Sequence, residues 1–300
     1  MKENQIKKIP LFTFFIEYVS HRFLKFLAVR NKKKGYAQLL CLPYDYVSQR
    51  IITNGLYEDH LLESLFFTFL KDRKNDFSEH TALDVGANIG NHSCFFSKIF
   101  KEVISFEPND TTLCILKANV FINHIDNVFV QSFGLGEKEE ELPFVEDKNG
   151  NLGGSHFCKD GEESTTESEL KTLPIKKGDD VIKSNFSNST IDLIKLDVEE
   201  FEFSVLKGLK GTIQKFHPVI LFESNTSEGA EGGKEIFNFL KENGYEYFYI
   251  IEAKGPKSKN KLMRVFERLT GCSDLYVSRL DDPEDRAYDL IIATATEVST

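Results

Sequence analysis

Short β-rich runs alternate with stretches of helical periodicity from residue 81 onward, and this alternation limits the possible folds of the 300-residue chain more than any other feature. Parallel strands need long crossover connections, usually helices, which then cover both faces of the sheet. We therefore expect an α/β fold with a mostly parallel seven-stranded sheet, helices on both faces, and an antiparallel pair formed by the last two strands. The expected strands are 81–85, 102–107, 127–133, 191–198, 218–223, 245–252 and 288–295, and the expected helices are 89–100, 110–124, 203–216 and 234–244.

Two segments interrupt this alternation. Residues 146–180 are polar and rich in glycine, so we expect a long loop that closes over a substrate and has no core of its own. Residues 254–287 join the last two expected strands and include a cationic stretch, 254–268. This second insertion either covers a site at the carboxyl edge of the sheet or is a surface excursion. We expect both insertions to belong to one main domain, 81–300, preceded by a helical cap region, 36–80.

The N-terminal 34 residues carry a charge opposite to that of the rest of the chain. Nine Lys and Arg stand against two Glu in this segment, a net charge of +7, so the other residues carry −17 of the total of −10. We predict a basic amphipathic helical extension over residues 1–35, whose apolar face either packs on the body or lies on an anionic bilayer. Its apolar side chains share one arc of a helix: Phe12, Phe15, Ile16, Val19, Phe23, Phe26 and Leu27.

Overall composition excludes several classes of protein. A net charge of −10 disfavours a general nucleic-acid binder, and five scattered cysteines without a CxxC pair indicate a reducing compartment without structural zinc. Residues 9–29 are apolar but contain Glu17, Arg22 and Lys25, and no small-residue cleavage site follows. We expect a cytoplasmic protein without a spanning helix, in peripheral contact with the inner membrane face. The oligomeric state cannot be inferred from the sequence.

A strand, a glycine loop and a helix follow one another in "ALDVGANIGNHSCFFSKIF", residues 82–100. The glycines Gly86 and Gly90 lack the G-x-G-x-x-G spacing of dinucleotide sites, and Asp84 would repel a diphosphate. A sulfonium or ammonium group would instead be attracted to this turn. Glu107, at the end of the second expected strand, is placed to accept hydrogen bonds from both hydroxyls of a ribose. Together these features fit S-adenosylmethionine; the alternative is that Asp84 caps a helix and Glu107 is a surface acid.

Acidic residues also follow the fourth and fifth expected strands. Asp197 and Glu223 should converge beside a bound methyl group, where a carboxylate can take the proton of an attacking hydroxyl or hold that hydroxyl in line. For Glu199, Glu200 and Glu202, a structural role at a helix N-terminus competes with a catalytic one. Several carboxylates in one cleft could also bind Mg²⁺, which we do not favour.

At these motifs the sequence resembles the FkbM-type methyltransferase family. The resemblance covers about residues 44–252 and the last strand, and it rests on "LDVGANIGNHS", "FEPN", "IDLIKLDVEEFE" and "PVILFE". It implies a Rossmann-like class I methyltransferase fold, S-adenosylmethionine as methyl donor, and O-methylation of a sugar or another hydroxylated acceptor. The implied cofactor-binding residues are Glu58, Asp84, Gly86, Asn88, Gly90, Glu107, Asn109, Ser132 and Gly134, the implied substrate contacts are Ser155 and His156, and the catalytic candidates are Asp197, Glu199 and Glu223.

One position departs from the family pattern. Where the family has DVEG after the fourth strand, this chain has Glu200 in place of the glycine. If that turn requires a positive φ, Glu200 is strained, and the roles of Asp197 and Glu199 depend on the local geometry. Two rival hypotheses are an NAD(P)-dependent oxidoreductase and a catalytically inactive membrane-docking scaffold. The basic segments predict an acceptor that is anionic or lipid-linked.

Overall fold

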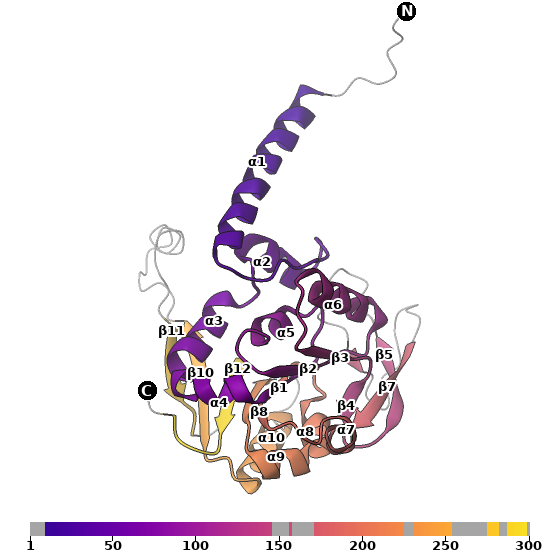
Figure 1. Cartoon of the computed structure of the whole chain (residues 1–300), viewed down its shortest axis with the longest axis vertical. Helices are drawn as coiled ribbons and strands as arrows, with labels where there is room; N and C mark the ends of the chain where they lie inside the picture. Colours follow the sequence, from indigo (N-terminus) through magenta and orange to yellow (C-terminus); the bar gives the residue numbers. More distant parts are fainter. Residues whose placement is uncertain are drawn as a thin grey trace, which may run out of the picture.

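The computed structural model describes residues 10–145, 156–157, 171–224, 231–253, 275–281 and 287–298. Within these residues the main sheet has eight strands in the order β11-β10-β12-β9-β8-β1-β2-β3 (Figure 1). The neighbours from β9 to β3 are parallel, whereas β12 is antiparallel to both β9 and β10, and β11 is antiparallel to β10. The strands are β1 (Thr81–Val85), β2 (Glu102–Phe106), β3 (Val128–Gln131), β8 (Ile191–Leu196), β9 (Val219–Ser224), β10 (Tyr247–Ala253), β11 (Leu275–Arg279) and β12 (Tyr288–Thr294).

This arrangement confirms the mostly parallel sheet and the antiparallel pairing of the last two expected strands. Because β12 is antiparallel to both of its neighbours, β10 runs in the same direction as β9. The expected number of seven strands is wrong, since β11 adds an eighth beyond β10. It lies inside 254–287, where we expected only an insertion. The cationic stretch 254–268 lies outside the described residues.

Two apolar cores lie on opposite faces of the sheet, because successive side chains of a strand point to opposite faces. In β1, Ala82 joins the core beneath α3, α4 and α5, whereas Leu83 and Val85 join the core formed with α7, α8, α9 and α10. Helices therefore cover both faces, as Figure 1 shows. The bounds are α2 (Tyr46–Asn54), α3 (Asp59–Ser64), η1 (Leu65–Phe69), η2 (Lys71–Arg73), α4 (Lys74–Glu79), α5 (Asn91–Phe96), α6 (Asp110–Ile122), α7 (Gly178–Asn185), α8 (Glu202–Gly208), α9 (Lys210–Phe216) and α10 (Glu231–Glu242).

A second sheet contradicts part of the expected loop at 146–180. The described residues form a four-stranded sheet in the order β4-β7-β5-β6. In β7, Leu173 and Ile175 are buried, so this end of the segment does contribute to a core. Proline inside each of two strands, at Pro143 and Pro174, obscured the pattern, because proline is unusual in paired strands. The strands are β4 (Gly134–Gly136), β5 (Glu140–Val145), β6 (His156–Phe157) and β7 (Lys171–Lys177).

The expected helix 203–216 is divided into α8 and α9 at Leu209. At the end of α8, a Cβ on Gly208 would lie 1.9 Å from the carbonyl oxygen of Gly136, so glycine alone permits this approach of α8 to β4. The expected helix over 89–100 is also shorter than predicted, since α5 ends at Phe96. Gly244, which follows α10, has a φ of +93°, the left-handed conformation that commonly ends a helix at glycine.

The predicted N-terminal helix is confirmed as α1 (Leu11–Lys33), which extends away from the body (Figure 1). Its C-terminal end is fastened to α2: Asn31 Nδ2 donates to the Ile52 carbonyl oxygen at 3.2 Å, and Arg30 donates to the Thr53 carbonyl oxygen. Within residues 11–33, all of them described, only Leu27 is buried. No helix in the described part of the chain is long and apolar enough to cross a membrane.

Candidate active site

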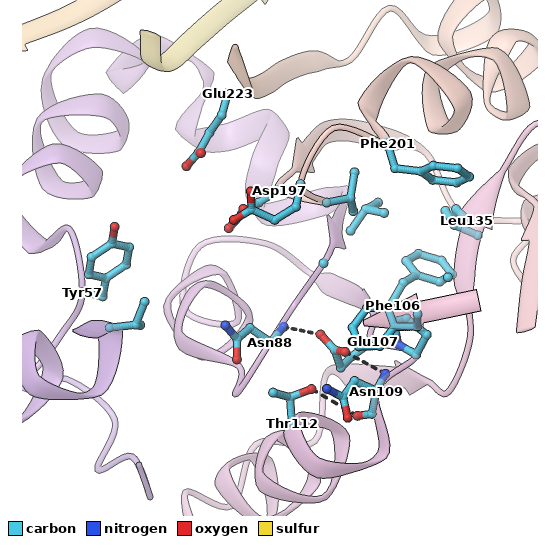
Figure 2. Close-up of a pocket in the computed structure, with 18 of the residues that line it drawn as sticks. Tyr57, Asn88, Phe106, Glu107, Asn109, Thr112, Leu135, Asp197, Phe201 and Glu223 are labelled. Carbon is cyan, nitrogen blue, oxygen red and sulfur yellow. Dashed lines mark hydrogen bonds between the residues drawn. The ribbon is translucent and has the colours of Figure 1, made fainter. Parts of the chain in front are cut away.

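A cavity of about 220 Å³ lies where the carboxyl ends of β1, β2, β8 and β9 meet. Because parallel strands end at the same edge of a sheet, residues far apart in the sequence converge here. Figure 2 shows Leu135 and Phe201 on one side of the view, Asp197, Glu223 and Tyr57 toward the other side, and Glu107 between the two groups. The two ends therefore differ in chemistry, one apolar and one acidic.

The loop after β1 passes between the ends of β8 and β2. Gly86 has a φ of +77°, and a Cβ there would lie 1.9 Å from the Asp197 carbonyl oxygen. The backbone N–H groups of Gly86 and Ala87 donate to the Phe106 carbonyl oxygen at 3.1 and 3.0 Å. Glycine is therefore required at position 86 both for its backbone conformation and for this close approach. Gly86 and Asn88 line the cavity, but Gly90, which precedes α5, does not.

Glu107 is a buried carboxylate on the wall of the cavity. Its Oε2 accepts the backbone N–H of Asn88 at 2.8 Å, and its Oε1 accepts that of Asn109 at 2.9 Å (Figure 2). The side chain is only 7% exposed, so the alternative that Glu107 is a surface acid is wrong. Burial raises the pKa of Glu107, and the N–H donors offset part of this effect. The oriented carboxylate retains acceptor capacity toward the cavity, which suits a diol.

Asp84 lies beneath the loop and is not among the described residues that line the cavity. It is fully buried, and its Oδ2 accepts the Ser93 hydroxyl at 2.5 Å. Its Oδ1 has no hydrogen-bond donor among the described residues, and the nearest cation is the Lys195 ammonium at 3.5 Å. The structure therefore places Asp84 beneath the loop, next to a lysine, although the family resemblance implied that it binds the cofactor.

Lys195 connects three groups of the site. Its Nζ lies 3.0 Å from Asp197 Oδ2 and 3.5 Å from Asp84 Oδ1, and it donates to the Gly86 carbonyl oxygen at 3.2 Å. Burial alone would lower the pKa of Lys195, but Asp197 and Asp84 raise it above its ordinary value. The buried side chain is therefore an ammonium ion that holds the glycine loop to the end of β8.

Asp197 and Glu223 have opposite protonation preferences. Burial alone would raise the pKa of Asp197, but the Lys195 ammonium outweighs burial and holds that pKa below its ordinary value. Burial, followed by repulsion from Asp197, raises the pKa of Glu223 to about 8. Near pH 7 the cavity thus holds one ionised and one mainly protonated carboxyl, a difference typical of acid and base pairs in active sites.

Glu58 lies next to the acidic end of the cavity. Its Oε2 is 3.2 Å from His92 Nε2, and both residues line a small adjoining pocket that also includes Asp197 and Glu223. Tyr57 lines the main cavity, and burial together with the nearby Glu58 raises the pKa of its phenol. The phenol therefore remains protonated and can donate a hydrogen bond.

The turn after β8 requires positive φ, as the family pattern suggested. Glu199 has a φ of +44° and Glu200 a φ of +69°, both in the left-handed region that costs about 1–2 kcal/mol per non-glycine residue. Glu199 lines the cavity. Glu202 has a structural role, since its Oε1 accepts the Val198 N–H at 3.3 Å where α8 begins. Burial raises the pKa of Glu202 to about 7.

The remaining predicted residues have mixed outcomes. Asn109 caps α6 by accepting the Thr111 N–H at 3.0 Å and also lines the cavity, as does Gly134. Ser132 is exposed and is not among the described lining residues. Ser155 lies outside the described residues, and of His156 only the backbone, in β6, is described.

Sequence reasoning missed Lys195 and Tyr57. A signal for Lys195 was available: it is a charged residue near the end of a mainly apolar strand, two residues before Asp197, and residues i and i+2 of a strand share a face. For Tyr57 no local signal existed, since it comes from the connection between α2 and α3. The apolar end, with Leu135 from β4 and Phe201 from the turn before α8, depends on the second sheet.

The lining residues define which ligands fit. Four acidic side chains line the cavity, Glu107, Asp197, Glu199 and Glu223, of which Glu223 is mainly protonated near pH 7. No Lys or Arg is found among its described lining residues. A diphosphate would be repelled here, whereas a nucleoside with a cationic substituent and a free diol would be favoured. Within the described residues, no group of three or more His, Cys, Asp or Glu is arranged to hold a metal ion.

A mostly parallel sheet with a glycine loop after its first strand and a cavity at its carboxyl edge defines a Rossmann-like fold. A model of the methyltransferase FkbM domain matches residues 84–247. The chain belongs to the FkbM methyltransferase family, which confirms the resemblance seen in the sequence.

Three individual proteins illustrate the similarity to this chain, each at 30% identity or less. Hexuronic acid methyltransferase AglP of Haloferax volcanii is 30% identical over 138 residues, 46% of this chain and 53% of that protein. Methyltransferase 1 of Beauveria bassiana is 22% identical over 142 residues, 42% of this chain and 57% of that protein. The chain thus spans about half the length of these curated relatives. A solved structure of methyltransferase FkbM from Methylobacillus flagellatus KT overlaps 89% of this chain and 59% of its own, with a TM-score of 0.43 and 16% identity.

Proposed function

We propose that this protein is an S-adenosylmethionine-dependent O-methyltransferase that acts on a hydroxyl of a sugar or glycan. The observation that carries the proposal is the oriented Glu107 carboxylate, held by two backbone N–H groups between an apolar end and an acidic end of one cavity. Membership of the FkbM family supports methyl transfer. The Haloferax relative, which is named as a hexuronic acid methyltransferase, supports a sugar as the acceptor.

The residues present fit this cofactor. Glu107 would accept hydrogen bonds from the ribose hydroxyls, and the apolar side chains of Phe106, Leu135 and Phe201 would contact the adenine. The glycine at position 86 lets the backbone come close to the ligand. S-adenosylmethionine supplies a methyl group on a positively charged sulfur, and the carboxylates at the acidic end favour a positive charge there.

Asp197 and Glu223 would act on the acceptor hydroxyl in different ways. The ionised Asp197 would accept a hydrogen bond from a neighbouring hydroxyl of the acceptor and so orient the reacting hydroxyl. The reacting hydroxyl would pass its single proton to the deprotonated form of Glu223 as its oxygen bonds to the methyl group that S-adenosylmethionine would supply, with the sulfur leaving as a neutral thioether. A base works best when its pKa lies near the working pH, and about 8 for Glu223 meets this condition better than the lowered pKa of Asp197.

The described lining favours a neutral hydroxylated region of the acceptor at the reacting end. Its carboxylates can accept hydrogen bonds from sugar hydroxyls, but they would repel an acidic group placed beside them. An anionic or lipid-linked acceptor remains our prediction for the more distant part of the molecule. That prediction depends on basic segments such as 254–268, which lies outside the described residues.

Calorimetry tests the cofactor and separates the rivals. We expect S-adenosylhomocysteine to bind, NADH not to bind, and Glu107→Ala to lose at least about tenfold in affinity for S-adenosylhomocysteine, since hydrogen bonds to a charged group contribute about 1.5–3 kcal/mol. The control is Glu242→Ala, an exposed glutamate of α10 far along the chain from the site. If NADH binds tightly and S-adenosylhomocysteine does not, the result favours an NAD(P)-dependent oxidoreductase instead.

Radiolabel transfer tests the reaction. Tritium from the labelled methyl group should enter neutral and acidic glycans only with an intact site, and the double variant Asp197→Ala, Glu223→Ala should lose this transfer. Undiminished turnover in the double variant refutes the proposed roles of both carboxyls. Binding of S-adenosylhomocysteine without any transfer across a broad glycan panel would support the inactive scaffold.

A further inference from the structure

The N-terminal helix α1 exposes many large apolar side chains to solvent. Phe12 is 70% exposed, Phe15 63% and Phe23 57%. Large apolar side chains as exposed as these usually occur singly on a protein surface. In α1 they are contiguous, because residues three and four apart lie next to each other on a helix. The other large apolar side chains exposed on α1 are Leu11, Phe14, Ile16, Tyr18, Val19, Leu24, Phe26 and Val29.

The described part of the body does not cover this surface. The described contacts of α1 with the body involve its C-terminal end, where Arg30 and Asn31 donate to carbonyl oxygens of α2. Figure 1 shows the rest of α1 projecting away from the other helices and the sheet. The alternative that the apolar face packs on the body is therefore wrong for the described residues.

Basic residues are distributed along and beside the same helix. Arg22 and Lys25 lie among the exposed apolar side chains, and Lys32 and Lys33 are exposed in the last turn. Residues 1–34 together carry a net charge of +7, whereas the rest of the chain carries −17 of the total of −10. An anionic surface would therefore attract the arm and repel the body.

We propose that α1 docks the protein on an anionic lipid bilayer, lying in the plane of the headgroups with the face that carries Phe12, Phe15, Phe23 and Phe26 toward the acyl chains. A helix that combines aromatic residues with Lys and Arg binds this interface through apolar burial and attraction to anionic lipid. Glu17, Arg22 and Lys25 favour the interface over the bilayer core, where charges are costly. A second copy of the chain is a poorer occupant, because pairing α1 with itself brings two arms of +7 together.

The same arrangement connects the bilayer to the cavity. α1 is fastened to α2, and Tyr46 and Val47 in the first turn of α2 line the cavity. α2 thus connects a bilayer bound by α1 to the lining of the cavity. This connection does not depend on the proposed function, since it follows from the contacts of α1 and α2 alone.

Flotation of the full chain with lipid vesicles tests the proposal. The vesicles contain phosphatidylcholine alone or phosphatidylcholine with 30% phosphatidylglycerol. The apolar variant is Phe12→Ser with Phe15→Ser and Phe23→Ser, and the matched control is Phe121→Ser, because Phe121 is 80% exposed but belongs to α6 on the body. The charge variant is Lys32→Gln with Lys33→Gln. Circular dichroism and the melting temperature establish that each variant is folded.

We expect the wild-type chain and Phe121→Ser to bind the anionic vesicles equally, and the apolar variant to bind them at least about tenfold more weakly. The charge variant should lose about fivefold in affinity per lysine on anionic vesicles and nothing on neutral vesicles. Equal partitioning of the wild type and the apolar variant overturns the proposal. The proposal is also overturned if the wild type binds neither kind of vesicle and light scattering shows a dimer that the apolar variant cannot form.

Discussion

Replacing Glu223 with glutamine should change how the stability of the protein depends on pH. Glutamine keeps the shape of a protonated carboxyl but cannot ionise. In the wild type, burial and the neighbouring Asp197 raise the pKa of Glu223 from an ordinary 4.5 to about 8. The folded state therefore binds this proton more tightly than the unfolded state. Its contribution to stability is complete below about pH 4.5 and is lost as the pH rises through about 8.

The size of the effect follows from these two pKa values. Each pH unit within the window changes the free energy of unfolding by about 1.4 kcal/mol per proton. Between pH 5.5 and pH 8 the wild type should lose about 3 kcal/mol through Glu223 alone, and partial contact of the side chain with water reduces this to about 2 kcal/mol. Glu223→Gln lacks this loss, so the variant should gain stability relative to the wild type as the pH rises.

Urea unfolding at several pH values between 5.5 and 8.5 measures the difference. Glu202 and the other titrating groups are present in both proteins, so their contributions cancel in the comparison. Glu242→Gln, at an exposed position of α10, is the matched control and should follow the wild type at every pH. No methyl acceptor is required, so this measurement is independent of the proposed function.

The result that would refute the reasoning is a constant difference between the wild type and Glu223→Gln. If the two free energies of unfolding stay parallel within about 0.5 kcal/mol from pH 5.5 to pH 8.5, Glu223 is already ionised in the folded protein. The assignment of a protonated Glu223 beside an ionised Asp197 would then fail, and with it the choice of Glu223 as the base.

Three further predictions concern the loop, the buried lysine and the reaction. Gly86→Ala should lower the free energy of unfolding by at least about 2 kcal/mol more than Gly35→Ala does. Both glycines have a similar positive φ, but only a Cβ at position 86 would clash with a neighbouring atom. Equal losses in the two variants would contradict this steric argument. Lys195→Met should cost about 3–5 kcal/mol in urea unfolding, because it leaves buried carboxylates without their cation; a loss below 1 kcal/mol would argue against the ion pair. The methyl-transfer rate, kcat/KM, should rise about tenfold per pH unit up to about pH 8 and then level off, and a flat profile would exclude a base with that pKa.

The main sheet and the general place of the site could be predicted from local patterns. Alternation of β-rich and helical stretches predicts parallel strands, and parallel strands bring their carboxyl ends together, so the convergence of Glu107, Asp197 and Glu223 followed from the topology alone. The second sheet could not be predicted in this way. Its strands are short and two contain proline, so their pairing depends on distant partners that provide no periodic signal.

The roles of the individual acids depended on the tertiary structure. Asp84 and Glu107 both lie at the carboxyl ends of strands, but only Glu107 lines the cavity. Asp84 is buried beneath the loop, where its carboxylate contacts the Ser93 hydroxyl and the Lys195 ammonium. The different pKa values of Asp197 and Glu223 have the same origin. Asp197 forms a direct ion pair with Lys195, whereas burial and repulsion from Asp197 outweigh the attraction of that lysine for Glu223. Neither "KLDVE" nor "ILFES" reveals this difference by itself.

The sequence by itself determined the fold class, the glycine loop and the basic apolar arm, because each depends on the order of residues along a few turns or strands. Only the tertiary structure decided the positive φ after β8, which carboxyl faces the cavity, which one is protonated, and that the described part of the body leaves the arm uncovered. These properties depend on burial and on neighbours distant in the chain, and such neighbours are brought together only by packing.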